Sequence, residues 1–361
     1  MTRKLRVGIV GAGGSVANVH FHAYRALSSI EVVAGAELNA DALARVVRAW
    51  GVAGYSDLEE MLEKESLDIV CICVPARYHR AIAEKIAAHK VHILVEKPLA
   101  TSIEDGQAIL DACERQGVQL YYGASYRSLT ANMKAREMIH SDDLGEVSMA
   151  MEIVIGGSGL ASYTECGPHH YAPGTPGGCG MGIMDHGIHL IDLFSWFLAA
   201  DVDTVFGRGN ISGAHPASEH VTITYSNGAV AHLIANTISF PTLLPTEGIV
   251  RWGGSWDSQN VLTLEPGWSD HPVNYQIHGS KGALKIYPYA EQLLFFGKDG
   301  LVPIQLDHHP MPQNFAIQMQ SFVDSIQYDR APAVTGRDGL NALKIVLAAY
   351  ESAAQQRLIK L

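Results

Sequence analysis

The chain has 361 residues and a mass of 39.0 kDa, too long for one ordinary hydrophobic core, so two domains or one large α/β unit are expected. Charged residues make up 17% and apolar residues 47% of the sequence, which excludes a disordered chain, a collagen-like repeat and a charged coiled coil. The formal net charge of −11, with no local basic patch, disfavours binding to nucleic acid or to anionic lipid.

The cysteines and the N-terminal residues indicate the compartment. The five cysteines form no even set, and Cys71 and Cys73 lie in an apolar run typical of a buried strand, so a reducing compartment is expected. The chain enters a strand pattern at once, without the apolar core of a secretory signal, and no stretch reaches the ~18 apolar residues of a membrane helix. We therefore expect a soluble cytoplasmic protein.

The first third of the chain alternates strand-like and helix-like segments, which favours parallel strands joined by helical crossovers. The predicted strands are residues 5–10, 32–36, 69–74, 91–95 and 118–122. The predicted helices are residues 17–27, 41–50, 57–65, 78–89 and 103–116. These elements predict an α/β domain with a doubly wound parallel sheet of five strands, whose ligands bind beyond the carboxyl ends of the strands.

The later part of the chain has a different rhythm, with longer strand-like segments that mostly alternate apolar and polar residues. The predicted strands are residues 146–155, 202–209, 220–225, 229–236 and 273–277, and the predicted helices are 184–198, 313–328 and 338–356. This predicts an α+β domain with an antiparallel sheet and helices on one side. We place a dinucleotide-binding domain at residues 1–126 and a substrate domain at 127–361, with a hinge near 123–145.

A glycine-rich turn follows the first predicted strand and precedes the first predicted helix. Its candidate dinucleotide-binding residues are Gly11, Gly13, Gly14, Ser15 and Val16. Missing side chains there let the backbone approach a pyrophosphate at the helix N-terminus. The third position of the G-x-G-x-x-G pattern is Val16, which predicts a wider spacing or a shifted register between helix and strand. An ordinary βα turn is the alternative interpretation.

Glu37 lies at the end of the second predicted strand, 26 residues after Gly11. An acidic residue at that distance is placed to accept hydrogen bonds from both ribose hydroxyls of an adenosine. A carboxylate there repels a 2′-phosphate, so NAD is favoured over NADP. The alternative is a solvated carboxylate at a strand end.

Two further groups of residues indicate chemistry. The segment Glu96-Lys97-Pro98 follows the fourth predicted strand, which puts Lys97 at the edge where the nicotinamide end is expected, and Pro98 restricts the backbone of Lys97. Within an apolar helix, Asp185, His189 and Asp192 fall at positions i, i+4 and i+7 and form one polar stripe. Buried carboxylates are costly unless paired, so this stripe faces a structural partner or a pocket.

The glycine-rich turn with a downstream His20, the Glu96-Lys97-Pro98 motif and the Asp185-His-Gly-Ile-His189 motif together resemble the glucose-fructose oxidoreductase/inositol dehydrogenase (Gfo/Idh/MocA) family. The resemblance spans nearly the whole chain and implies an NAD(P)-dependent oxidoreductase. It also implies a second domain with a large, mostly antiparallel open sheet that makes dimers or tetramers.

The resemblance implies roles for individual residues. Lys97, Asp185 and His189 match the catalytic triad of the family. The resemblance also implies residues at the cofactor (Pro75, His79, Glu96 and Lys97) and further residues at the substrate (Arg127 and Asp192). We assign His189 as the general base, Lys97 as the group that stabilises alkoxide charge, and Asp185 as the group that orients His189 or binds a neighbouring hydroxyl of the substrate.

A sugar, polyol or inositol is the expected substrate, because the second domain is acidic and shows no cluster of Arg for a phosphate. His169 and His170, in the glycine-rich segment 157–178, are candidate hydroxyl-binding residues. The spacing of these histidines and of Cys166 and Cys179 matches no standard zinc set, so no metal is predicted. Two alternatives remain: transient oxidation by NAD during glycoside cleavage, and a dinucleotide-sensing regulator without catalysis.

Overall fold

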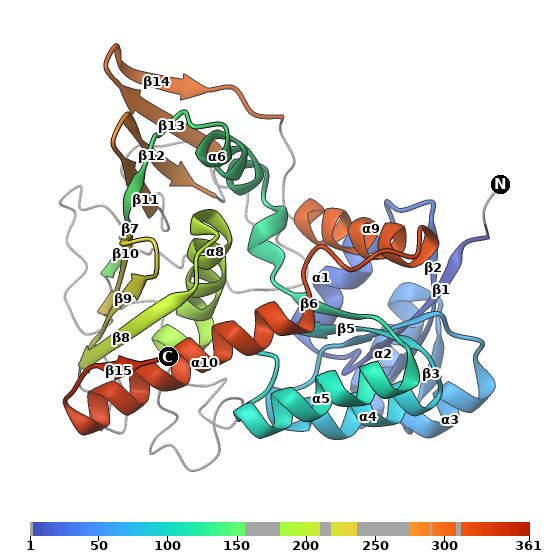
Figure 1. The fold of residues 1–361 in the computed structure, drawn as a ribbon. Coiled ribbons are helices and arrows are strands. Elements are labelled where there is room, and N and C mark those ends of the chain that lie inside the picture. The colour runs from blue at the N-terminus through green and yellow to red at the C-terminus, as the bar shows by residue number, and fades with distance from the viewer. Residues whose placement is uncertain (1–2, 156–180, 210–217, 237–274, 289–290, 308–311) are drawn as a thin grey trace. The chain divides into compact units, whose positions relative to one another are not determined.

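The computed structural model describes residues 3–155, 181–209, 218–236, 275–288, 291–307 and 312–361, which are coloured in Figure 1. The chain divides into two compact units. Among the described residues, the first unit contains 3–125 and 312–340, and the second contains the rest.

The first unit is built on a parallel sheet of six strands in the order β3-β2-β1-β4-β5-β6. The strands are β1 (Leu5–Val10), β2 (Ile30–Ala36), β3 (Ala53–Tyr55), β4 (Ile69–Ile72), β5 (His92–Glu96) and β6 (Leu120–Gly123). The predicted doubly wound sheet is confirmed, and β3 is added to the five predicted strands. The strand order reverses at β1 and β4, so a ligand site is expected beyond their carboxyl ends.

Six helices of this unit connect the strands or cover the sheet (Figure 1). They are α1 (Ser15–Tyr24), α2 (Ala40–Trp50), α3 (Leu58–Lys64), α4 (His79–Ala88), α5 (Ile103–Gln116) and α9 (Gln313–Gln327). Side-chain caps define where several begin: Asn39 accepts a hydrogen bond from Ala42 N–H (2.9 Å), and Ser102 accepts one from Asp105 N–H (3.1 Å). Gly117 ends α5 with a left-handed backbone (φ +66°).

Helix α9 belongs to the first unit although it is far along the chain. It packs against α1, where the Phe315 ring meets the His20 ring edge-on with ring centroids 5.0 Å apart. On β6, the Tyr121 ring lies with its centroid 5.2 Å from that of Phe322. The sequence predicts that this helix packs on the sheet of the second domain, whereas the structure places it in the first unit. Residues of the first unit cover the apolar face of α9.

The second unit contains a nine-stranded sheet in the order β14-β13-β12-β11-β7-β10-β9-β8-β15. The strands are β7 (Val147–Ile155), β8 (Val202–Gly209), β9 (Ser218–Tyr225), β10 (Val230–Asn236), β11 (Tyr275–Gly279), β12 (Gly282–Tyr287), β13 (Gln292–Gly297), β14 (Gly300–Ile304) and β15 (Ile359–Lys360). Pairing is antiparallel except between β7 and β10, which confirms the large, mostly antiparallel sheet. The prediction included β7 to β11 and omitted the other four strands.

The helical elements of the second unit are α6 (Thr130–His140), a π-helical turn called η5 (Met181–Gly187), α8 (Ile188–Leu198) and most of α10 (Gly336–Gln355). Helix α8 packs on β7 and continues directly from η5. Helix α6 lies in the segment where only a hinge was expected. Ser352 of α10 accepts a hydrogen bond from Gly207 N–H of β8 (2.9 Å), which ties this helix to the sheet.

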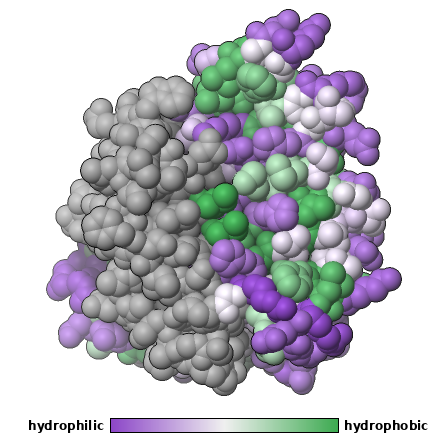
Figure 2. Space-filling model, turned by 90° about the vertical axis from the view of Figure 1, so that its left-hand side faces the viewer, coloured by the Kyte–Doolittle hydropathy of each residue, from purple (hydrophilic) through white to green (hydrophobic). Residues whose placement is uncertain are grey.

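The described surface mixes polar and apolar residues (Figure 2). Exposed apolar side chains include Phe296 on β13 and Leu301 and Val302 on the edge strand β14. In the described part of the chain, no helix is long and apolar enough to cross a membrane.

Candidate functional site

The glycine-rich turn joins β1 to α1 by close backbone contacts. Gly11 has a left-handed backbone (φ +75°), and a Cβ there would lie 2.7 Å from the Cys73 carbonyl oxygen. A Cβ at Gly13 would lie 2.7 Å from Ala42 Cβ. Only residues without side chains fit these positions.

Helix α1 begins at Ser15 without a side-chain cap, since Gly14 occupies the N-cap position. Its first backbone N–H groups therefore lie at a glycine turn with the positive end of the helix dipole, an arrangement that fits a dinucleotide pyrophosphate. Val16 is 37% exposed while Ala17 is fully buried. The small residue that faces the interior is thus Ala17, and the Val16 side chain is partly exposed to solvent.

The carboxylate of Glu37 is held against the same turn. Its Oε2 accepts a hydrogen bond from Gly13 N–H (3.1 Å), and its Oε1 accepts one from Asn39 N–H (2.9 Å). Both bonds fix the carboxylate just beyond the end of β2. That position suits an acceptor for ribose hydroxyls next to the pyrophosphate turn.

His79 follows the short turn Ala76–Tyr78, which begins after Pro75. Its ring is fully buried, with Nε2 2.8 Å from the Val74 carbonyl oxygen and Nδ1 3.1 Å from the Leu99 carbonyl oxygen. Burial lowers the pKa of His79, and the two carbonyl contacts oppose that shift. In its neutral form the ring has one N–H, which donates to one of these two carbonyls, and the ring lies between the segments that follow β4 and β5.

The Glu96-Lys97-Pro98 segment follows β5, and its Lys97–Pro98 peptide bond is cis. The buried Glu96 carboxylate contacts two elements: Oε1 lies 2.7 Å from His20 Nε2, and Oε2 accepts a hydrogen bond from Lys97 N–H (3.3 Å). Sequence reasoning noted His20 in the family motif but assigned it no partner. His20 and Glu96 are 76 positions apart in the chain, so no local pattern relates them.

In the second unit, η5 and α8 carry the predicted polar stripe. Asp185 is buried, and the His189 ring stacks on the Tyr126 ring with centroids 4.2 Å apart and planes 9° apart. This stacking holds the imidazole flat against an aromatic face. Tyr126 was not predicted as a site residue, although it directly precedes Arg127.

A second imidazole–carboxylate pair lies beside this stripe. His186 Nε2 is 2.9 and 3.1 Å from the two carboxylate oxygens of Glu152 on β7, and its ring edge faces Tyr126 at 6.2 Å. Glu152 is buried. Neither residue was predicted as part of the site, although His186 lies inside the Asp185-His-Gly-Ile-His189 motif. For Glu152, the alternation of polar and apolar residues in β7 was the available signal.

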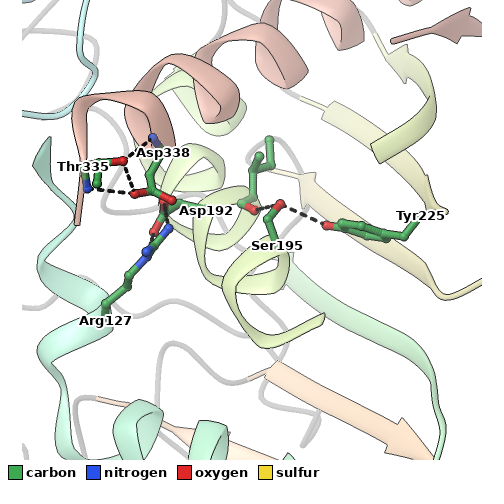
Figure 3. Close-up of polar contacts among 7 residues, drawn as sticks. Arg127, Asp192, Ser195, Tyr225, Thr335 and Asp338 are labelled. Atoms are coloured by element: carbon green, nitrogen blue, oxygen red, sulfur yellow. Dashed lines mark hydrogen bonds and ion pairs between the residues drawn. The ribbon is translucent and has the colours of Figure 1, made fainter. Parts of the chain in front are cut away.

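Arg127 and Asp192 form a buried ion pair, drawn in Figure 3. Arg127 Nε and Nη2 donate to Asp192 Oδ2 (2.7 Å) and Oδ1 (2.6 Å). One turn along α8, the Trp196 ring lies 5.6 Å from the Arg127 guanidinium carbon and 4.6 Å from that of Arg136. Arg127 and Asp192, which were each predicted at the substrate, thus bind each other, and both carboxylate oxygens of Asp192 take part.

The remaining predicted residues divide as follows. Lys97 belongs to the first unit, and Asp185 and His189 belong to the second. His169, His170, Cys166 and Cys179 lie outside the described residues. Among the described residues, no group of three His, Cys, Asp or Glu side chains is arranged to hold a metal ion.

Comparison with known proteins matches two family models to this chain. Residues 5–124 match the NAD-binding Rossmann fold of the Gfo/Idh/MocA oxidoreductase family, and residues 136–361 match its C-terminal alpha/beta domain. D-apiose dehydrogenase of Rhizobium rhizogenes is 26% identical and covers 99% of this chain and 97% of its own length. Myo-inositol 2-dehydrogenase of Thermotoga maritima is 20% identical over 99% of this chain and 98% of its own.

Solved structures share the fold. Scyllo-inositol dehydrogenase from Lactobacillus casei, with bound NAD(H) and scyllo-inositol, has a TM-score of 0.75 at 19% identity and covers 99% of each chain. Aldose-aldose oxidoreductase from Caulobacter crescentus, complexed with glycerol, has a TM-score of 0.80 at 19% identity and covers 99% of this chain and 100% of its own. The chain therefore belongs to the Gfo/Idh/MocA family of NAD(P)-dependent oxidoreductases, with a Rossmann domain that binds the dinucleotide.

Proposed function

We propose that the protein oxidises a secondary alcohol carbon of a sugar, polyol or inositol, or catalyses the reverse reduction. The observation that carries this proposal is the match, along nearly the whole chain, to relatives named as dehydrogenases of D-apiose and of myo-inositol. The acidic second part of the chain favours an uncharged, hydroxyl-rich substrate over a phosphorylated one.

The chemistry requires removal of the hydroxyl proton as hydride leaves the same carbon. His189 is proposed to accept that proton, since imidazole suits proton transfer near neutral pH. The Lys97 ammonium donates a hydrogen bond to the same oxygen and stabilises developing alkoxide charge. Asp185 orients His189, and Tyr126 supports its ring by stacking. Bound nicotinamide supplies the hydride acceptor.

NAD is proposed as the preferred cofactor. The Glu37 carboxylate, held by Gly13 N–H and Asn39 N–H, places negative charge where a 2′-phosphate would have to lie. We also propose Pro75, His79 and Glu96 on the cofactor side, and Arg127 and Asp192 on the substrate side. His79 acts through the backbone that it contacts, and Arg127 and Asp192 act through their mutual ion pair.

The test is a cofactor-coupled absorbance assay against a panel of sugars, polyols and inositols, with NAD and NADP in parallel. Lys97→Ala and His189→Ala should each bind NAD like the wild type while losing most turnover. Full activity in either variant would refute the assigned roles, and a clear NADPH preference would refute the role of Glu37. Net hydrolysis of a glycoside with NAD unchanged would instead show glycoside cleavage through transient oxidation, and the proposed dehydrogenase reaction would be wrong.

Self-association through the sheet of the second unit is proposed as well, as a dimer or tetramer. Phe296, Leu301 and Val302 expose apolar surface on β13 and β14 at one end of this sheet. Light scattering coupled to gel filtration gives the mass directly, and a monomer at micromolar concentration would overturn this proposal.

A further inference from the structure

A buried run of polar contacts connects α1 to the residue that follows β5. His20 Nδ1 lies 2.7 Å from the Tyr24 hydroxyl, and His20 Nε2 lies 2.7 Å from Glu96 Oε1. The Tyr24 hydroxyl lies 3.3 Å from Cys71 Sγ on β4. At the other end, Glu96 Oε2 accepts the Lys97 backbone N–H at 3.3 Å. The run therefore ends at the backbone of a proposed catalytic residue.

The contacts indicate which atom donates in the hydrogen bond between His20 and Glu96. Burial raises the pKa of Tyr24 well above its usual value, and burial raises the pKa of Cys71 to about 12, so both groups keep their protons. Tyr24 can therefore donate to His20 Nδ1 or accept from it. In either case Nε2 carries a hydrogen, because a bare ring nitrogen facing a carboxylate would set two acceptors against each other.

The surroundings hold this arrangement in place. The Phe315 ring of α9 packs edge-on against His20, and His20 is fully buried. The titratable groups that interact with the Glu96 carboxylate are Tyr24 on the same helix as His20, Cys71 and Cys73 at β4, and His79 at the start of α4. The His20 ring supplies a side-chain donor to Glu96 through Nε2, so it helps to hold the carboxylate in position.

We propose that His20 and Tyr24 are positioning residues for Lys97 and that they act through Glu96. His20 holds one oxygen of the carboxylate, which leaves the other oxygen to hold the Lys97 N–H, and Tyr24 fixes the ring of His20. This inference rests on the proposed function only in that Lys97 must act on the substrate for its position to affect turnover. Neither His20 nor Tyr24 is proposed to touch substrate.

Three variants separate positioning from packing. His20→Leu removes the donor at similar bulk, while His20→Gln supplies an amide N–H that can replace the ring Nε2–H. Tyr24→Phe removes only the hydroxyl that fixes the ring. Tyr55→Phe is the matched control, since Tyr55 also donates to a carboxylate (Glu65, 2.9 Å) in the same unit but away from Lys97.

The first measurement is hydrogen exchange at the Lys97 backbone N–H in the protein without added NAD. His20→Leu should exchange there about tenfold faster than the wild type, and His20→Gln should stay within about threefold. The second measurement compares NAD affinity, by fluorescence titration, with kcat for the best substrate of the panel. His20→Leu should lower kcat on the order of 10- to 100-fold with NAD affinity unchanged, and Tyr24→Phe should lower it less.

The outcomes are distinguishable. Exchange at Lys97 that stays at the wild-type rate in folded His20→Leu and Tyr24→Phe overturns the inference, even if the wild type is an active dehydrogenase. Failure of His20→Gln to rescue exchange and kcat overturns it as well, because packing alone would then explain the loss. Faster exchange in His20→Leu with rescue by His20→Gln supports the inference even if the panel yields no substrate, in which case only the proposed function fails.

Discussion

Removing the charge of Asp192 should destabilise the second unit strongly. Asp192 and Arg127 are 2% and 7% exposed at their side chains, and two hydrogen bonds of 2.7 and 2.6 Å join them. The substitution Asp192→Asn keeps the shape but leaves the Arg127 guanidinium buried without its carboxylate. Arg136 adds a second positive charge on the same Trp196 ring, and among the described residues its buried Nε has no hydrogen-bond partner.

The expected loss follows from the general cost of breaking one side of a buried ion pair, about 3–5 kcal/mol. For a domain of this size, about 2–4 °C of midpoint are lost per kcal/mol, so the melting midpoint should fall by roughly 6–20 °C. Burial and the neighbouring Arg127 already lower the pKa of Arg136, which indicates that the site tolerates further positive charge poorly.

The assay is thermal unfolding of the wild type, Asp192→Asn, Arg127→Met and the double variant Arg127→Met/Asp192→Leu. Replacement of both partners by apolar side chains should recover most of the loss, because neither charge is then left buried alone. Glu60→Gln, which breaks the exposed Lys64–Glu60 pair, is the control and should leave the midpoint unchanged. A double variant as unstable as the two single changes combined would refute the reasoning.

Three further predictions concern the first unit. Gly13→Ala should weaken NAD binding by about tenfold or more, because the added Cβ would lie 2.7 Å from Ala42 Cβ and 2.9 Å from Glu37 Oε2. Isothermal titration measures the affinity for NAD, and an unchanged affinity would contradict the close approach of the backbone. Stability should fall as the pH drops below the usual histidine pKa of 6.5, since burial lowers the pKa of His79 and the unfolded chain then binds a proton that the folded chain does not. His79→Gln should flatten this dependence of the melting midpoint on pH, and equal slopes for the wild type and the variant would argue against it. Burial raises the pKa of Cys71 and of Cys113 to about 12, so iodoacetamide should leave both thiols unmodified in the native protein at about pH 8. Site-resolved mass spectrometry measures the labelling, and a rate as fast as for free cysteine would disprove this prediction.

The sheet of the first unit could be predicted almost completely because most of its strands are buried along nearly their whole length and read as short apolar runs. The strand β3 was missed, since Ala53–Tyr55 is too short for a period of two to show. The strands β12 to β14 were missed because glycines begin or end them and Pro303 interrupts the last. Such residues indicate turns, and only pairing with a neighbouring strand makes them part of a sheet.

The position of α9 shows a different limit. Its apolar periodicity indicates that one face must be covered, and the sequence was sufficient to place the helix within one residue of its observed bounds. Periodicity carries no information on which surface provides the cover. The contacts of Phe315 with His20 and of Phe322 with Tyr121 depend on shapes brought together only by the complete fold.

The same reasoning applies to the polar stripe. Sequence alone established that Asp192, on an apolar helix, needs either a structural partner or a pocket, and it selected Arg127 independently for another role. Arg127 and Asp192 are 65 positions apart in the chain, so no periodic pattern relates them. With both carboxylate oxygens of Asp192 held by Arg127, a substrate hydroxyl that bonds to Asp192 would compete with a buried charge pair. The three residues of the stripe therefore have unequal roles. Asp192 stabilises α8, which carries His189 and continues directly from η5 with Asp185. Among variants that fold, turnover should be far more sensitive to changes at Asp185 and His189 than to the charge at Asp192.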